Sequence, residues 1–448
     1  MEGENITELV THLAFQLAAI LMAAKIGGEI CQRWLKIPPV IGELLAGVAI
    51  GPFALGQFTI TSGFGALFAL PHGFGEVGGG VIPVSNELWA IGQIGAIVLL
   101  FMAGLETNAK LFFRYAGPGA VVAVGGIVFP FLFGVYATIL FDFADGFSDP
   151  RALFMGAIMS ATSVGITARV LSERRKLDTP EGVTILAGAV IDDVLSILIL
   201  SVVVGIADTG SISTGEILGI AAKALGFWFS LMAIGFLLSR QISRFFLSFR
   251  TTGAALGLSF ALALLVSGLA EEFGLAMIIG AYSIGLALSG TRLAHQIEEQ
   301  LGHLANALVP IFFVVMGMLV NVGSMTSAIG LGVVITLLAI VGKVVGAGAP
   351  ALTVGFNLRG ASRIGVGMLP RGEVALIIAG VGLAAGVIEQ DLFGVAILMT
   401  IVTTVIAPII LIPLFDKGGS GLRRPPTDGP VASGEPAAAP AEEPVEGG

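Results

Sequence analysis

The sequence has few of the residues that give a soluble domain its hydrated surface. Only 12% of its 448 residues are charged, against roughly a quarter in ordinary soluble domains. The mean hydropathy of +0.97 is too high for a soluble fold. Cys31 is the only cysteine, so a disulfide within the chain is excluded. These deficits favour a protein that lies largely within a lipid bilayer.

Basic residues are missing from the start of the chain. The stretch from Met1 to Glu8 has no Lys or Arg, and the first positive residues, Arg33 and Lys36, follow a long apolar run. A cleavable secretory signal carries its positive charge before a short apolar run. We therefore expect this run to be a first membrane helix that is retained.

Long apolar runs fill most of the sequence. A membrane-spanning helix needs about 20 mostly apolar residues, and glycine, which occurs 64 times here, is more frequent in such helices than in soluble ones. The runs predict thirteen helices, at residues 8–32, 38–56, 86–105, 116–141, 151–173, 181–207, 214–239, 252–270, 274–290, 303–321, 328–356, 363–386 and 391–414.

The distribution of basic residues between the loops tests this count. With the loops numbered alternately, one set holds 17 of the 22 Lys and Arg residues, and the other set holds only Arg151. Positive residues accumulate in cytoplasmic loops, so we expect an external N-terminus and a cytoplasmic C-terminus. The seventeen are Arg33, Lys36, Lys110, Arg114, Arg169, Arg174, Arg175, Lys176, Arg240, Arg244, Arg250, Arg292, Arg359, Arg363, Lys417, Arg423 and Arg424.

The order of the predicted helices fits an inverted repeat. The first six and the last six match, and the helix at 214–239 links them. The offset of seven helices is odd, so matching helices run in opposite directions. This architecture is typical of secondary transporters, whose site lies between the repeats near the bilayer midplane.

The end of the chain differs in composition from the rest. Residues 417–448 are rich in Gly, Pro, Ala and Glu, and we expect a disordered cytoplasmic tail.

Two adjacent aspartates, Asp192 and Asp193, interrupt the apolar run VTILAGAVIDDVLSILILSVVV. They lie about 18 Å from the start of their helix at 1.5 Å per residue, where a charge costs at least a few kcal/mol. A purely structural carboxylate is the alternative. Neighbours on a helix point about 100° apart, so the two side chains cannot share one partner equally. We expect one to face a cavity while the other pairs.

The expected cationic partner is Lys343 in LLAIVGKVVGAGAP. It lies deep in its helix, too far from either end to extend easily to water, although a lysine near a helix end does so. A buried lysine has a labile pKa. Lys343 is therefore also a candidate to release a proton.

Two predicted helices have weak centres. The helix at 151–173 has a small, hydroxyl-rich middle, Ser160 to Gly165, for which close packing of small residues is the alternative. The helix at 363–386 has three glycines, Pro370 and an Arg-Gly-Glu sequence at depth. Interrupted segments at matching places in two halves point to a transporter site. Arg371 and Glu373 are placed to balance the helix-end dipoles.

Other charges in apolar runs are interpreted as structural. Glu43 lies within IPPVIGELLAGVAIGP and is expected to help hold its helix. Lys25 and Glu29 are four residues apart near the end of the first helix, so we expect them to pair.

Several of these stretches, taken together, resemble the monovalent cation:proton antiporter family. They are IPPVIGELLAGVAIGP, LLFMAGLETN, the helix with Asp192 and Asp193, PIFFVVMGMLVN, the helix with Lys343, and LPRGEVALI. The resemblance covers about residues 8–414, and within the family it is to the bacterial branch with an Asp-Asp pair.

The resemblance implies an antiporter domain over residues 1–416 that forms a homodimer in the bacterial inner membrane. Helices within 116–207 and 328–414 would form a moving core that contains two crossed broken helices. Helices within 8–105 and 252–321 would form the dimerisation scaffold.

The resemblance also implies roles for individual residues. Asp193 would carry the ion and the proton, and Asp192 would be the partner of Lys343. Thr162 and Ser163 match the hydroxyl-bearing stretch of the first broken helix. Glu373 matches the acidic residue of the second.

These features predict a transporter that is neither an enzyme nor a nucleic-acid-binding protein, with no cofactor. The predicted activity is exchange of Na+ or Li+ for H+ by elevator-like alternating access, in the service of pH homeostasis. We expect each exchange cycle to carry net charge across the membrane, which a current measurement would decide.

Potassium/proton exchange by the same fold is the first alternative. An intramembrane aspartyl protease is remote, because it needs carboxyls that converge from separate helices. A passive channel would not need carboxylates beside a buried lysine.

Overall fold

Apolar runs and their polar ends divide the chain into helices. This computed structural model describes residues 6–35, 38–57, 66–71, 82–209, 214–273, 275–321 and 329–423. No strand occurs within these ranges, where one isolated β-bridge joins Phe356 to Leu422. The α-helices of these ranges are α1 (Ile6–Glu29), α2 (Pro39–Ile50), α3 (Asn86–Glu106), α4 (Ala109–Leu140), α5 (Pro150–Ser160), α6 (Val164–Glu173), α7 (Pro180–Thr209), α8 (Thr214–Leu247), α9 (Ala254–Glu272), α10 (Met277–Leu288), α11 (Arg292–Met318), α12 (Ile329–Thr353), α13 (Leu358–Gly367), α14 (Glu373–Ala384) and α15 (Gln390–Asp416).

Most of these helices are suited to a membrane. Among the described residues, 10 helical segments are long and apolar enough to cross one, and three shorter apolar helices accompany them, at Pro39–Ile50, Met277–Leu288 and Val374–Leu383. Each of the thirteen predicted segments overlaps one of these. The prediction of an all-α polytopic membrane protein is therefore confirmed.

Some helices extend beyond the apolar runs that predicted them. The tenth segment was expected to begin at residue 303, but α11 begins at Arg292. Its first turns are amphipathic, with Leu293, Ile297 and Leu301 buried among polar neighbours. The polar residues between them interrupt the apolar run, so the run alone places the start of the helix too late. The helix nevertheless begins earlier, because its apolar face packs against the rest of the protein.

The expected pairing of Lys25 with Glu29 is wrong. Lys25 Nζ donates to the backbone carbonyl of Asn306 in α11 at 2.9 Å, and Glu29 lies 3.7 Å from Arg33. Because α1 packs against α11, the lysine reaches a backbone acceptor on the neighbouring helix. An exposed ion pair between Lys25 and Glu29 would contribute only about a few tenths of a kcal/mol, which is too little to hold the lysine on its own helix.

Two membrane helices are broken, as predicted. The first stops at Ser160 and resumes as α6, and the second stops at Gly367 and resumes as α14. The two interruptions touch, since the backbone N–H of Ser163 donates to the carbonyl of Pro370 at 2.8 Å. A Cβ on Gly372 would lie 2.6 Å from Ser163 Oγ. Only glycine permits this close approach of the two connections.

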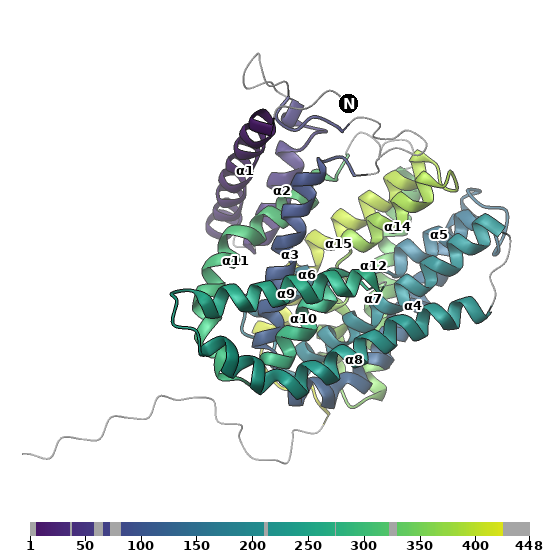
Figure 1. Ribbon diagram of the computed structural model, residues 1–448. Helices are drawn as coiled ribbons and strands as arrows, with labels where there is room; N and C mark the ends of the chain where they lie inside the picture. The colour runs from purple at the N-terminus through teal and green to yellow at the C-terminus, as the bar shows by residue number, and fades with distance from the viewer. Residues whose placement is uncertain are drawn as a thin grey trace, which may run out of the picture.

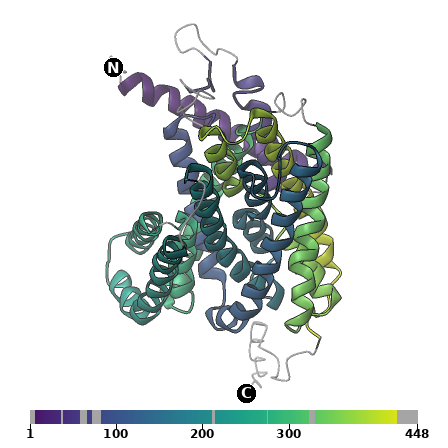
Figure 2. The same ribbon diagram turned by 90° about the vertical axis from the view of Figure 1, so that its right-hand side faces the viewer.

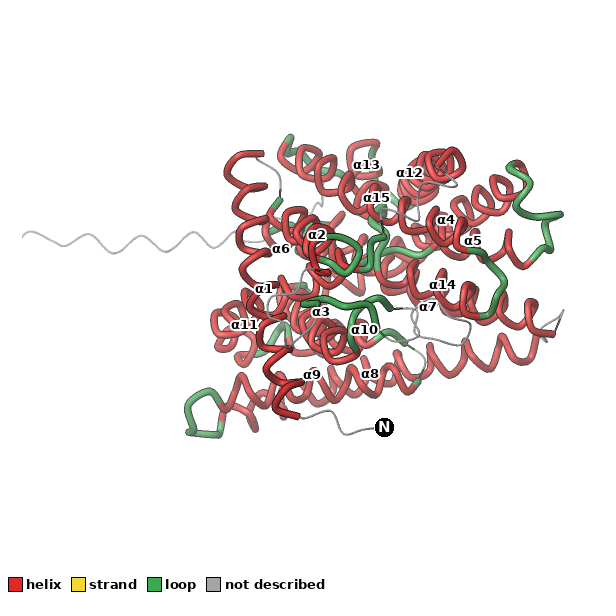
Figure 3. Tube along the Cα trace, turned by 90° about the horizontal axis from the view of Figure 1, so that it is seen from above, coloured by secondary structure: helices red, strands yellow, loops and turns green. Residues whose placement is uncertain are grey.

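The helices pack in two groups. In the broken-helix group, α12 packs against α4, α13 and α15, while α4 packs against α5 and α7, and α14 against α5 and α15. In the α3 group, α3 packs against α10 and α11, α11 against α1 and α2, and α9 against α10. Figures 1 and 3 show α1 and α11 on one side of the molecule and α4 and α5 on the other.

Two helices have special positions relative to these groups. α6 contacts both, because it packs on α3 as well as on α15 and α7. α8 packs against α9, α10 and α7, and Figure 2 shows the teal-green pair α8 and α9 on the opposite side of the molecule from the light-green α12.

A buried ion pair links three helices of the broken-helix group, α7, α13 and α15. Arg363 of α13 lies 2.6 Å from Glu181 in the first turn of α7, and their side chains are 5% and 4% exposed. Arg363 also donates to the backbone carbonyls of Leu414, Gly418 and Gly419. The end of α15 is thus fastened to the start of α7 and to the middle of α13, which leads into the second break.

The first residues of the predicted tail lie against the same helix ends. Asn357 Nδ2 donates to the carbonyls of Ser420 and Leu422, and its backbone N–H donates to Gly421. A Cβ on Gly421 would collide with Glu181 Oε1. Residues 417–423 therefore pack on the helix bundle, while residues 424–448 of the predicted tail lie outside the described residues.

The first broken helix begins at a charged cap. Asp149 accepts a hydrogen bond from the backbone N–H of Arg151 at the start of α5, and Arg151 Nη2 lies 2.7 Å from Asp149 Oδ2. The hydrogen bond from the Arg151 side chain, helped by the backbone N–H of Asp145, lowers the pKa of Asp149 to about 2. Arg151, the exception in the loop-charge pattern, is thus balanced by two acidic neighbours.

Removing the buried arginine should destabilise the protein. Arg363→Gln leaves Glu181 buried without its cation, which costs about 3–5 kcal/mol of unfolding free energy. Arg174→Gln is the matched control, since Arg174 lies 3.4 Å from Asp416 with side chains 45% and 53% exposed. Such a surface pair contributes at most about 1 kcal/mol. Thermal unfolding of the purified variants in detergent measures the difference, and equal midpoints would contradict the role given to Arg363.

The stabilising effect of the Asp149 cap should depend on pH. Its pKa falls from 3.8 to about 2 on folding, so the ionised form stabilises the fold above about pH 4, and this contribution is lost as the pH falls toward about 2. Wild type should therefore unfold at a higher temperature than Asp149→Asn at about pH 5, with a smaller difference at about pH 3. A difference that does not change with pH would show that the charge of the cap is unimportant.

Candidate functional site

The two predicted aspartates lie in the middle of α7. Asp192 and Asp193 are 0% and 1% exposed, and at about 1.5 Å per residue they lie about 18 Å from the first residue of the helix. α7 packs against α4, α5, α13 and α14, so it touches the parts of both broken helices that lead to or from the breaks. A carboxylate buried this deeply requires a cation or a proton.

Lys343 of α12 provides a cation. Its Nζ lies 2.9 Å from Asp192 Oδ1, and both side chains are completely buried. The same Nζ donates to the backbone carbonyl of Ser160 at 2.8 Å. Ser160 is the last residue of α5, and the carbonyl end of a helix carries partial negative charge. Lys343 therefore balances the aspartate and the end of the broken helix together.

Arg371 brings a second cation to the same helix end. Its side chain is fully buried, and its Nη1 donates to the carbonyl of Ala161 at 2.5 Å. Thr404 Oγ1 of α15 donates to the backbone carbonyl of Arg371. The connection between α13 and α14 thus delivers positive charge to the carbonyl end of α5.

The connection between α5 and α6 holds the two predicted hydroxyl residues. Thr162 and Ser163 are 2% and 1% exposed. Thr162 Oγ1 has no hydrogen-bond partner among the described residues. Because Lys343 contacts both Asp192 and Ser160, the aspartate pair lies near this connection, and the hydroxyls follow within three residues of Ser160.

Glu373 is the first residue of α14, and its side chain lies outside the described part of the structure. Its backbone position is nevertheless informative. The N-terminal end of a helix carries partial positive charge, so the start of α14 is suited to an acidic residue.

Sequence reasoning missed the contribution of α15. Thr400, Thr403 and Thr404 are buried, and Thr404 holds the backbone of Arg371. In the sequence, the run TIVTTV within an otherwise apolar helix was the feature that could have indicated this contribution. A threonine often bonds to its own helix backbone, so its spacing alone does not indicate a contact with another helix.

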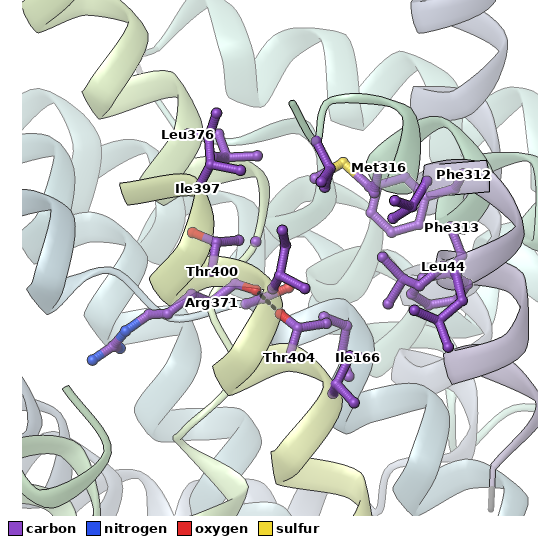
Figure 4. Close-up of a pocket in the computed structure, with 17 residues that line it drawn as sticks. Leu44, Ile166, Phe312, Phe313, Met316, Arg371, Leu376, Ile397, Thr400 and Thr404 are labelled. Atoms are coloured by element: carbon purple, nitrogen blue, oxygen red, sulfur yellow. Dashed lines mark hydrogen bonds between the residues drawn. The ribbon is translucent and has the colours of Figure 1, made fainter. Parts of the chain in front are cut away.

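A cavity lies between the two groups beside the broken helices, and Figure 4 shows it. The guanidinium of Arg371 points away from this space and from Leu44 and Phe312 on its opposite wall. Its walls are mostly apolar. They comprise Leu44, Leu45 and Val48 of α2, Phe312, Phe313 and Met316 of α11, Val320, Ile166 of α6, Ser163, Arg371, Gly372, Leu376 of α14, and Ile397, Thr400, Ile401, Thr404 and Val405 of α15.

A larger, polar cavity lies at the other end of α6. It is lined by the end of α3, the connection between α6 and α7, and the start of α11, and it includes Glu106, Ser172, Asp178 and His295. Burial raises the pKa of Asp178, which a hydrogen bond from the Asn108 backbone partly offsets. α6 therefore runs from one cavity, at Ser163 and Ile166, to the other, at Ser172.

Two broken helices that meet beside a buried aspartate–lysine pair, within a bundle of membrane-length helices, define a polytopic membrane transporter. The chain belongs to the sodium/hydrogen exchanger family: the model of its transmembrane region, described as "Sodium/hydrogen exchanger, transmembrane", matches residues 18–417.

Individual proteins show the same relationship. The chain is 38% identical over 441 residues to the high-affinity Na+/H+ antiporter NhaS3 of Synechocystis sp., covering 93% of this chain and 92% of the relative. It is 32% identical over 398 residues to the Na+/H+-K+ antiporter GerN of Bacillus cereus, covering 89% and 95%. The fold is similar to that of the sodium proton antiporter MjNhaP1 from Methanocaldococcus jannaschii, with a TM-score of 0.63, 18% identity, and coverage of 90% and 96%.

Removing Lys343 should destabilise the protein through Asp192. Lys343→Met leaves a buried carboxylate without its cation, at a cost of about 3–5 kcal/mol. The double variant Asp192→Asn/Lys343→Met removes both charges and should recover much of this loss. Unfolding midpoints in detergent test the coupling. If the double variant is no more stable than Lys343→Met, the two side chains do not stabilise each other as assigned.

Proposed function

We propose that this protein exchanges Na+ for H+ across a membrane by secondary active transport. The observation that carries the proposal is the pairing of Asp192 with Lys343 next to a second buried carboxyl, Asp193, near the crossing of two broken helices. It is supported by the similarity to NhaS3, a Na+/H+ antiporter, and to GerN, a Na+/H+-K+ antiporter. In this proposal Asp192 holds Lys343, and Asp193 binds the transported cation or a proton.

The chemistry of the site suits a small hard cation. An ionised carboxylate, hydroxyls and backbone carbonyls are the hard oxygen ligands that such cations prefer. We propose that ionised Asp193 binds Na+ with Thr162 and Ser163, and that protonated Asp193 does not. Because one carboxylate accepts either the cation or the proton, the two fluxes are coupled by competition.

Alternating access follows from the two helix groups. We propose that the broken-helix group carries the site past the α3 group, and that the cavities at the two ends of α6 belong to the opposite access routes. A cation or protons at the site lower its negative charge, which reduces the cost of moving it past apolar walls.

The proposed location is a bacterial inner membrane, with the N-terminus outside the cell and the C-terminus in the cytoplasm. We further propose a homodimer formed through the α3 group.

Potassium/proton exchange is the second candidate. The relative GerN is a Na+/H+-K+ antiporter, and carboxylate and hydroxyl oxygens bind either cation. Initial exchange rates in proteoliposomes with Na+, Li+ or K+ at equal concentration distinguish the two. Exchange with Na+ and Li+ supports the proposal, whereas exchange with K+ alone would replace it.

Asp193→Asn should abolish exchange, because an amide neither releases a proton nor offers a charged ligand. Asp192→Asn should retain measurable exchange, with lower thermal stability, because it leaves Asp193 in place and unpairs Lys343. The two conservative variants are matched controls for each other. Proton flux driven by a Na+ gradient in proteoliposomes gives the result, and sustained exchange by Asp193→Asn would contradict the assignment.

A further inference from the structure

Glu43 has no role in the site described above, yet it is a carboxyl placed where charge is expensive. The residue is 3% exposed, and its Oε2 has no hydrogen-bond partner among the described residues. It lies in α2, one residue before Leu44, which lines the cavity between the two helix groups. A buried carboxylate is strongly destabilising unless a cation or a proton accompanies it.

A candidate partner belongs to the other side of that cavity, where Ile166 of α6 lies about one turn before Arg169. The charged residues that act on Glu43 are Arg169, Lys25 and Glu173. Lys25 is held by the carbonyl of Asn306. Arg169 lies in α6 and pairs with Glu173 of its own helix at 2.6 Å, its side chain only 14% exposed.

Another carboxyl of the α3 group, Glu106, does contact α6 in this structure. Glu106 Oε2, at the end of α3, accepts a hydrogen bond from Ser172 Oγ of α6 at 2.7 Å. The charge of Arg169 acts on Glu106 as well as on Glu43. The cation of α6 thus lies in the field of two carboxyls of the α3 group. One of them is joined to α6 in this structure, and the other is not.

We propose that Glu43 is a positioning residue of the transport cycle, the fixed carboxylate that pairs with Arg169 when α6 shifts relative to α2. The proposal rests on the alternating access proposed above. In the present state Arg169 is held by Glu173, and Ser172 by Glu106. A shift of about one helical turn, about 5.4 Å, is the kind of step that exchanges such partners between packed helices. The pair would stabilise the second state and leave Glu43 without a cation in the first.

The test separates the movement of the protein from the binding of the ion. Glu43→Gln should remove the pair that stabilises the second state. We expect its maximal exchange rate to fall about tenfold, with a KM for Na+ within about twofold of wild type. Glu43→Asp keeps the charge and should recover most of the rate. Glu29→Gln, which neutralises an exposed carboxylate of α1, is the matched control and should exchange at the wild-type rate.

Double variants show whether Arg169 is the partner. Arg169→Gln should slow exchange as Glu43→Gln does, and the combination should be no slower than either single variant. Glu173→Gln breaks the pair within α6 and leaves Glu43 its partner, so it should be nearly as fast as wild type. Wild-type rates for Glu43→Gln, losses that multiply in the double variant, or an equal loss in Glu173→Gln would each overturn the proposal.

If Glu43→Gln does not fold, as judged by gel filtration, a comparison of Arg169→Lys with Arg169→Gln gives the same decision, since only the lysine keeps the charge. Failure of the proposed function would appear separately, as exchange by Asp193→Asn.

Discussion

The carbonyl end of α5 stops inside the protein, and the negative charge that collects there must be matched by cations. A helix that ended at the membrane surface would be solvated by water and would not need them. Here Lys343 reaches the carbonyl of Ser160, and Arg371 reaches that of Ala161. Both cations are themselves buried and must be compensated. The aspartates of α7 are the acidic groups beside them, and Asp192 pairs with Lys343.

This constraint links the two halves of the molecule. The lysine comes from α12, the arginine from the connection that follows α13, and the aspartates from α7, so three separate segments converge on one helix end. Hydrogen bonds between the interruptions hold the same arrangement, from Ser163 to Pro370 and from Thr167 to Gly367. The buried pair of Arg363 and Glu181 joins α13 to the far end of α7. A helix break that would be unstable alone is therefore held by contacts from its counterpart.

Much of this organisation could be predicted from the sequence, because burial in a membrane makes each charge informative. Asp192 and Lys343 stood out as charges within long apolar runs, and Pro370 and its glycines marked a break by local chemistry. The misses are contacts between distant segments. The partner of Lys25 is a backbone carbonyl of α11, and backbone acceptors leave no pattern in a sequence. The support that Thr404 gives to Arg371 and the contacts of residues 417–423 depend on packing in the same way.

The position of α6 connects the site to movement. It starts at the crossing, ends beside a polar cavity, and contacts both groups. A helix with contacts on both sides is suited to exchange its partners when one group moves, and Glu106 of the α3 group already accepts a hydrogen bond from Ser172 of α6. The residues at the start of α6 would then contribute to ion binding, whereas the charged residues at its end would stabilise one or the other state of the transport cycle.

The proposed coupling requires that one carboxylate, that of Asp193, accepts either a cation or a proton. Proton release on adding Na+ to purified protein in weakly buffered detergent solution tests this without a membrane or a gradient. We expect release of about one proton per bound Na+ if only Asp193 titrates, about two if Lys343 also does, and none from Asp193→Asn. Saturable Na+ binding to the wild-type protein with no proton released at any pH would contradict it.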